Sequence, residues 1–210
     1  MSLPEQFGGA EIYWAHLDDV HRLDPSSVLS PSEVAQAGRF RDPTDRHRFE
    51  ARHIALRLVI GRRIGCSAHD VRIESDEAGR PFAHGLPGSF STSHSGAIGV
   101  MALAPGPIGV DIEHFRAGAF DGGVCAVAFS SREREWISRA SNSDVAFLQC
   151  WTRKEAAFKA LGGSMDEWAS TTMTPTTGAA GLRIEDAIVT EDLILAVAAQ
   201  ATSGRVVKSA

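Results

Sequence analysis

Apolar and polar positions recur with two different periods along the chain, which predicts both helices and strands. From residue 42 to residue 65, apolar residues such as Ile54 and Leu58 recur at helical spacing after an Asp-Pro-Thr start. The segment 109–113 instead alternates apolar and acidic residues with period two, as a strand does. The apolar run at residues 100–104 predicts a buried strand. The chain is therefore expected to mix long amphipathic helices with sheet.

The two halves of the chain carry similar segments in the same order. Each half has a Ser-x-x-Glu helix start, an Arg-x-Glu-Ala pattern on a long helix and similar strand segments. The matched segments are residues 30–33 and 130–133, 48–51 and 153–156, 71–74 and 182–185, and 100–104 and 193–198. Unless these short echoes are coincidental, they predict an α+β fold of two half-domains, residues 1–106 and 107–210. Each half would pack helices on one face of an antiparallel sheet, with a pseudo-twofold between the halves and the active site in their cleft.

Composition excludes several classes of protein. The 210 residues are 43% hydrophobic and 22% charged, which is typical of a soluble globular protein, and the net charge of −5 disfavours a general nucleic-acid binder. The N-terminus lacks a basic start and an apolar run, and serines and prolines interrupt the apolar stretch 85–110, so we expect neither a secretory signal nor a membrane span. Three cysteines without paired spacing predict no disulfide framework or zinc site and fit a reducing cytoplasm.

Positive charge is concentrated on the first long predicted helix, which contains six arginines. Arg48 and Arg52 share one face of it, and the guanidinium fork suits phosphate, although a solvated basic face is the alternative. Arg80 lies in a Gly-Arg-Pro turn, and Ser93 and His94 precede an apolar strand. Arg48, Arg80, Ser93 and His94 together form a candidate phosphate cradle, although a histidine beside serines is also an ordinary loop group.

Three carboxylates, in two segments of the chain, complete the candidate chemistry. Asp111 and Glu113 point the same way from the predicted strand, roughly 6 to 7 Å apart along the chain. Glu155 and Lys159 are four residues apart on a predicted helix and share a face, although an ordinary solvated helix pair has the same spacing. Carboxylates crowded on one face repel unless a positive group lies between them.

Three blocks in series carry a resemblance to a known family. They are Phe-x-x-Ser-His-Ser at residues 90–95, Gly-x-Asp-x-Glu at 109–113, and Trp-x-x-Lys-Glu-Ala-x-x-Lys-x-x-Gly at 151–162. In this order the chain resembles the 4′-phosphopantetheinyl transferase superfamily, in particular the broad-specificity, pseudo-dimeric class that includes the activator of surfactin synthetase. The third block is highly specific for this family, whereas the second block alone is weak evidence for it. The predicted duplicated fold agrees with the fold of that family.

The resemblance implies Mg²⁺-dependent transfer of the phosphopantetheine arm from coenzyme A to a serine of an acyl or peptidyl carrier protein, releasing adenosine 3′,5′-bisphosphate. By position, Asp111, Glu113 and Glu155 would hold magnesium, which takes few carboxylates together with phosphates and waters. Glu155 would be the general base, directly or through a metal-bound water, and Lys159 would stabilise the leaving group. The residues that the resemblance assigns to coenzyme A are Arg48, Arg80, Ser93, His94, Asp111, Lys154, Glu155 and Lys159.

The chain departs from the family pattern at two places. Glu33 and Gln36 stand where relatives often have basic residues, so the 3′-phosphate is expected to be held less strongly, or by Arg39 and Arg41 instead. The Gly-x-Gly pattern that usually closes the third block reads Gly162-Gly163-Ser164 here, and the Ser/Thr-rich loop that follows up to residue 178 could alter carrier docking.

Two other functions and several partner properties are left open by the sequence. The chain could be an inactive coenzyme A or nucleotide-binding module, or another Mg²⁺-dependent phosphoryl-transfer hydrolase. A duplicated chain builds both halves of its cleft, so a monomer is expected. An acidic carrier domain would suit a basic docking surface, with a merely solvated face as the alternative. The candidate docking residues are Arg132, Arg134 and Arg139, with Phe120, Val124 and Phe129 as apolar neighbours.

Overall fold

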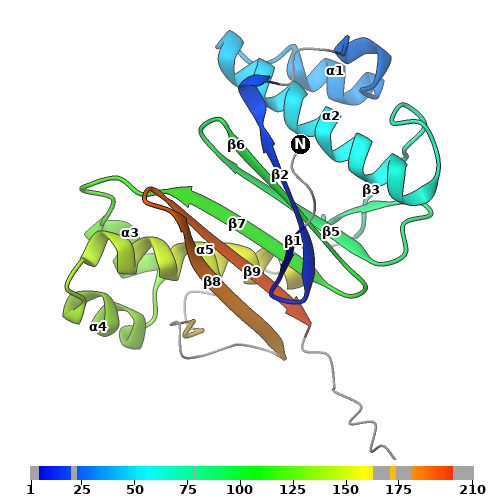
Figure 1. Ribbon diagram of the computed structural model, residues 1–210. Helices are drawn as coiled ribbons and strands as arrows, with labels where there is room; N and C mark the ends of the chain where they lie inside the picture. The colour runs from blue at the N-terminus through cyan, green and yellow to red at the C-terminus, as the bar shows by residue number, and fades with distance from the viewer. Residues whose placement is uncertain (1–4, 20–22, 78, 163–170, 174–180, 201–210) are drawn as a thin grey trace, which may run out of the picture.

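The computed structural model describes residues 5–19, 23–77, 79–162, 171–173 and 181–200 (Figure 1). Its elements in chain order are β1 (Glu5–Phe7), β2 (Ala10–His16), the 3₁₀ turns η1 (Leu17–Asp19) and η2 (Pro25–Ser27), α1 (Pro31–Ala37), α2 (Pro43–Ile64), β3 (Ile73–Ser75), β4 (Pro81–Ala83), β5 (Ser89–Ser95), β6 (Ile98–Ala104), β7 (Ile108–His114), α3 (Gly122–Ala128), α4 (Ser131–Arg139), α5 (Ser143–Leu161), β8 (Leu182–Thr190) and β9 (Leu193–Gln200). None of the described helices combines the length and apolarity that a membrane crossing needs.

The predicted helix starts are confirmed. Ser30 opens α1 and Ser130 opens α4, each in a capping box in which the serine accepts a backbone N–H and the glutamate three residues on accepts the cap's own N–H. Asp42 caps α2 ahead of Pro43, and its carboxylate accepts the first free N–H groups of the helix. Gly65 caps the C-terminus of α2, and its φ of 76° is a left-handed conformation that favours glycine.

The strands form antiparallel sheets, so the predicted α+β class is confirmed. One sheet has the order β1-β2-β6-β5, another has the order β7-β9-β8, and β3 pairs with β4 alone. In the first sheet β6 lies between β2 and β5, and in the second sheet β9 lies between β7 and β8. The two sheets therefore share this arrangement, as a duplicated chain would. The matching of residues 71–74 with 182–185 was wrong, because β3 belongs to the small hairpin whereas β8 is in a main sheet. The pseudo-twofold and the boundary after residue 106 stay predictions.

The two main sheets share one hydrophobic cluster, and helices cover their other faces. Helix α2 packs on β2, β5 and β6 through a second cluster, and α5 packs on β7, β8 and β9 (Figure 1). The shared cluster contains Ala10, Ile12, Val100, Ala102 and Ala104 from the first sheet, and Ile108, Val110, Ile112, Leu193, Leu195, Val197 and Ala199 from the second. Alternate residues of β7 therefore face the shared core, and the residues between them face α5.

Gly109 allows α5 to lie against β7. A Cβ atom at Gly109 would lie 1.8 Å from the carbonyl oxygen of Ala156 and 2.7 Å from the backbone nitrogen of Ala160. Ala156 and Ala160 are themselves buried and present no larger side chain to the strand. The glycine of the Gly-x-Asp-x-Glu block is thus required by the approach of helix backbone to strand backbone.

We expect Gly109→Ala to destabilise the protein strongly, because the added methyl group meets backbone atoms that cannot move aside. The loss in the free energy of unfolding should reach or exceed the roughly 1–3 kcal/mol typical of overpacked cores. Denaturant unfolding would measure it against Gly122→Ala, a control at a glycine whose added Cβ meets nothing within 4 Å. An unchanged unfolding midpoint for Gly109→Ala would show that the strand and helix do not approach this closely.

Candidate active site

Asp111 of β7 is the centre of the candidate site. Its side chain is buried, and its Oδ1 atom accepts hydrogen bonds from Ser93 Oγ and Lys159 Nζ, both at 2.7 Å. Lys159 reaches it from α5 because that helix lies so close to the strand. The other oxygen, Oδ2, is buried and has no hydrogen-bond partner among the described atoms. A buried carboxylate oxygen without a partner is costly, so this atom is positioned to accept a ligand.

Serine hydroxyls join β5 to β7. These two strands belong to different sheets, yet Ser91 Oγ accepts the Val110 backbone N–H at 3.1 Å and Ser93 Oγ donates to Asp111. Ser95 Oγ accepts the His114 N–H at 3.1 Å and donates to Glu113 Oε2 at 3.2 Å. The hydroxyl of Ser93, predicted to bind coenzyme A, is therefore turned to Asp111, and its contact with a substrate stays a prediction.

Burial raises the pKa of each of the three predicted metal-binding carboxylates, and the charge of Lys159 opposes the rise at all three. Burial first, and then the charge of Asp111, raises the pKa of Glu113. Burial, Asp111 and Glu113 in turn raise the pKa of Glu155, and burial raises the pKa of Asp111. The Glu155 carboxylate accepts no hydrogen bond from any residue that the structure describes. Burial, together with like charge at the two glutamates, therefore outweighs the effect of the nearby Lys159 ammonium.

Within the described part of the chain, no group of three or more His, Cys, Asp or Glu side chains converges closely enough to enclose a metal ion. The donor set is nevertheless of the kind that a hard divalent cation takes, since it consists of carboxylate oxygens with one buried oxygen left unpartnered. A cation that completes its shell with water and substrate phosphates needs no closed protein cage. The carboxylates thus provide the type of ligand that such an ion prefers, although the described residues do not surround it.

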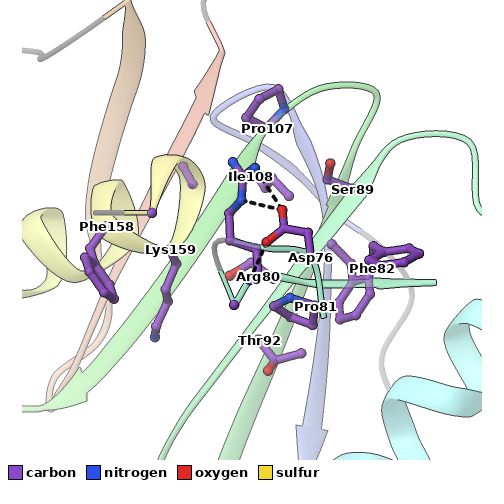
Figure 2. A pocket seen from close by; sticks show the side chains of 15 residues that line it. Asp76, Arg80, Pro81, Phe82, Ser89, Thr92, Pro107, Ile108, Phe158 and Lys159 are labelled. Atoms are coloured by element: carbon purple, nitrogen blue, oxygen red, sulfur yellow. Dashed lines mark hydrogen bonds and ion pairs between the residues drawn. The ribbon is translucent and has the colours of Figure 1, made fainter. Parts of the chain in front are cut away.

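A cleft of about 470 Å³ lies beside this centre and is lined from both predicted halves (Figure 2). Lys159 lines it from α5, and Arg80 lies opposite, where its guanidinium contacts the Asp76 carboxylate at 2.9 Å. The Arg80 backbone N–H also donates to Asp76, which fixes the turn before β4. The cleft is lined by Asp76, Gly79, Arg80, Pro81, Phe82, Ser89, Phe90, Ser91, Thr92, Pro107, Ile108, Phe158, Lys159, Ala160 and Gly162.

A smaller pocket of about 220 Å³ holds Arg48 and His94. Arg48 makes two contacts with the Asp18 carboxylate, at 2.8 and 3.0 Å. His94 Nδ1 lies 2.8 Å from Arg52 Nη1. A guanidinium can only donate, so Nδ1 accepts and the proton of the neutral imidazole is on Nε2, free to donate elsewhere. Arg52 was not among the residues predicted for the site, although its helical spacing from Arg48 was the signal for it.

The structure does not bring Lys154 together with the other predicted residues. Its side chain is 1% exposed, and its ammonium contacts Glu133 Oε2 at 3.1 Å and the Thr171 carbonyl at 2.8 Å. It also lies 5.8 Å from the centre of the Phe129 ring. Burial lowers the pKa of Lys154 while Glu133 raises it. This placement favours a structural tie between α4, α5 and residues 171–173 over the predicted contact with pyrophosphate.

Three further sequence predictions concern the docking surface, Glu33 and the loop that follows α5. Phe129 is 2% exposed, so its inclusion in a docking surface was wrong, whereas Phe120 and the three candidate arginines are exposed. Glu33 is turned into the protein, where it contacts Arg57 and His53 at 2.8 and 2.9 Å. The loop of residues 164–178 lies outside the described residues except for 171–173.

Comparison with known proteins identifies the family. A family model described as the 4′-phosphopantetheinyl transferase superfamily matches residues 107–192. The 4′-phosphopantetheinyl transferase HetI of Nostoc sp. is 31% identical over 73% of this chain and 68% of its own length. The 4′-phosphopantetheinyl transferase Sfp of Bacillus subtilis is 29% identical over 65% of this chain and 61% of its own. A putative 4′-phosphopantetheinyl transferase of Synechocystis sp. is 28% identical, and the match covers 58% of it. The chain belongs to the 4′-phosphopantetheinyl transferase superfamily, and it spans about three fifths to two thirds of these relatives.

The depressed pKa of His94 makes a prediction about acid stability. Burial, followed by the charges of Arg52, Lys159 and Arg48, lowers this pKa from 6.5 to about 4, with Asp45 opposing them. Between these values the unfolded chain binds a proton that the folded protein does not, so His94 makes stability fall as the pH falls. We expect a drop from pH 7 to pH 5 to cost wild type more stability than His94→Gln.

Urea unfolding at both pH values would measure this difference. The raised carboxylate pKa values of Asp111, Glu113 and Glu155 act in the opposite direction, but they are present in both proteins and cancel in the comparison. Equal losses in the two proteins would mean that His94 titrates normally.

Proposed function

We propose that this protein transfers the 4′-phosphopantetheine arm of coenzyme A to a serine of an acyl or peptidyl carrier protein and releases adenosine 3′,5′-bisphosphate. The observation that carries the proposal is the contact of Lys159 with Asp111 beside a cleft, with one Asp111 oxygen left unpartnered among the described atoms. Family membership and the names of the relatives support the same reaction. Those names lend no support to a binding module without activity or to a hydrolase.

In the proposed reaction the carrier serine oxygen attacks the phosphorus next to the pantetheine arm. A new P–O bond forms, the bridging P–O bond of the pyrophosphate breaks, and the nucleotide leaves with the electron pair. Magnesium, held by Asp111, Glu113 and Glu155, would neutralise charge on the pyrophosphate oxygens. Lys159 lines the cleft with its ammonium only partly exposed, so it can stabilise the charge that develops on the leaving phosphate.

The serine proton needs an acceptor, and Glu155 is suited to the role. Its carboxylate has a raised pKa and no hydrogen bond from the described residues, so it can take the proton directly or through a water. Binding to a metal ion would lower the proton affinity of this carboxylate and so make it a weaker base by either route.

The cellular setting is proposed from the same features. All three cysteines are free, with Cys66 exposed and Cys125 and Cys150 buried, which suits a reducing cytoplasm. One chain lines both sides of the cleft, so a monomer suffices for the site. No nucleic-acid or membrane partner is needed for this chemistry.

Intact-mass spectrometry of an apo carrier protein, incubated with this protein, coenzyme A and Mg²⁺, tests the function directly. We expect a gain of about 340 Da on the carrier, the mass of the arm, and its loss when EDTA is added. Coenzyme A binding without any gain on several carriers would instead identify a binding module.

Glu155→Gln should lower turnover by roughly 10²–10⁴-fold, the usual contribution of a general base, while coenzyme A binding remains measurable. Glu191→Gln is the matched control, because Glu191 is exposed in the turn between β8 and β9. Single-turnover kinetics and calorimetry would separate chemistry from binding. Wild-type turnover in Glu155→Gln would remove this residue from both the base and the metal-binding roles.

A further inference from the structure

The cleft beside the candidate site contains a carboxylate as well as two cations. Among the described residues that line it, the charged ones are Arg80, Lys159 and Asp76. Figure 2 shows the side chains of Asp76 and Arg80 in contact within the cleft. A cleft that takes a polyanionic nucleotide, as the proposed function requires, gains affinity from the cations and loses affinity through a carboxylate. Attraction of the ligand therefore does not account for Asp76 on this wall.

Asp76 has a structural role that does not require its charge. The turn between β3 and β4 is closed by two backbone hydrogen bonds of 2.9 Å, from the Asp76 N–H to the Arg80 carbonyl and from the Gly79 N–H to the Asp76 carbonyl. The Asp76 Oδ1 atom accepts the Arg80 N–H, also at 2.9 Å. The amide oxygen of an asparagine is an equivalent acceptor for this N–H. The turn therefore explains an acceptor at residue 76, but it does not explain a negative charge.

The negative charge of Asp76 is directed to one edge of the Arg80 guanidinium. The Nε and Nη2 atoms of Arg80 both lie 2.9 Å from Asp76 Oδ2. This contact occupies one edge of the guanidinium and leaves the edge at Nη1 available to a ligand. Arg80 contacts no other carboxylate in the described part of the chain. The cation is thus held in the cleft by the residue whose charge opposes ligand binding.

The exposure of this ion pair decides whether the contact is permanent. The side chains of Arg80 and Asp76 are 42% and 34% exposed, so water screens their attraction and the pair contributes little to stability. By contrast, Lys154 and Glu133 are 1% and 0% exposed, and separating them would leave a buried charge without a partner. A phosphate group offers a guanidinium a charge-assisted, bidentate contact. It can therefore replace the Asp76 carboxylate at Arg80 at small cost.

We propose that Asp76 is an exchangeable counter-ion for Arg80, which holds the guanidinium in the free protein and yields it to a phosphate group of the bound nucleotide. The contact is broken or shared when the substrate binds, and it forms again when the product leaves. Asp76 therefore lowers the affinity of the cleft for coenzyme A and for adenosine 3′,5′-bisphosphate, which favours product release. This inference rests on the proposed function, because it takes these nucleotides as ligands. It gives Asp76 no part in the chemical step.

Calorimetric titration of coenzyme A and of adenosine 3′,5′-bisphosphate into wild type and Asp76→Asn tests the proposal. Asparagine keeps an oxygen for the Arg80 N–H and removes the charge. We expect Asp76→Asn to bind both nucleotides roughly two- to fivefold more tightly, the range for release of an exposed ion pair. Asp76→Ser also keeps a side-chain oxygen and should show the same gain if Asp76→Asn fails to fold. Glu77→Gln is the matched control, because Glu77 is exposed in the same turn and does not line the cleft.

The double variant Asp76→Asn/Arg80→Gln separates exchange from simple repulsion. If Asp76 acts through Arg80, the gain in affinity should disappear when Arg80→Gln is compared with the double variant. An equal gain in both backgrounds would show that Asp76 only repels the phosphates, and this result would overturn the proposal.

Three other outcomes contradict the inference. Weaker binding by Asp76→Asn would show that Asp76 orients Arg80 for the ligand, and unchanged binding would show that no exchange takes place. An equal gain in Glu77→Gln would assign the effect to net charge. Each of these results leaves the proposed function standing if wild type still modifies a carrier protein. Failure of wild type to bind either nucleotide would refute the proposed function together with this inference.

Discussion

The close contact between α5 and β7 at Gly109 is the constraint on which the candidate site depends. The absence of a side chain there lets helix backbone approach strand backbone, and the small residues Ala156 and Ala160 keep the opposite surface flat. At this separation Lys159 can reach Asp111 across the interface. A wider spacing would leave Asp111 buried without the cation that partly offsets its charge, so packing and electrostatics at this point are coupled.

The second constraint is the row of serines on β5. Because β5 and β7 lie in different sheets, hydroxyl groups take over the connection that a backbone ladder would otherwise make. Ser93 and Ser95 point towards β7 and hold Asp111 and Glu113, while His94 between them points to the other face and meets Arg52. One strand therefore fixes the acidic centre and the basic pocket relative to each other.

Local pattern was sufficient to predict the features that depend on neighbours in sequence. The helix starts at Ser30, Asp42 and Ser130 and the mixture of helices with sheet follow from caps and periodicity. The role of Lys154 could not be predicted this way, because its partners Glu133 and Thr171 reach it only through packing. The similarity of residues 71–74 to residues 182–185 was misleading because strand pairing also depends on packing. Similar sequences do not determine which sheet a strand joins.

Buried polar groups that stabilise the fold can be distinguished from those of the candidate site by whether they have partners within the chain. Buried ions with structural roles, such as Lys154 with Glu133 and Arg153 with Asp186, have their partners within the chain. In the described residues, Asp111 Oδ2 accepts no hydrogen bond and the Arg52 guanidinium contacts no carboxylate. Leaving such groups unpaired costs stability, and folding alone gives no reason to accept that cost. In the proposed function, a phosphate-bearing substrate and a divalent cation would supply the missing partners at these positions.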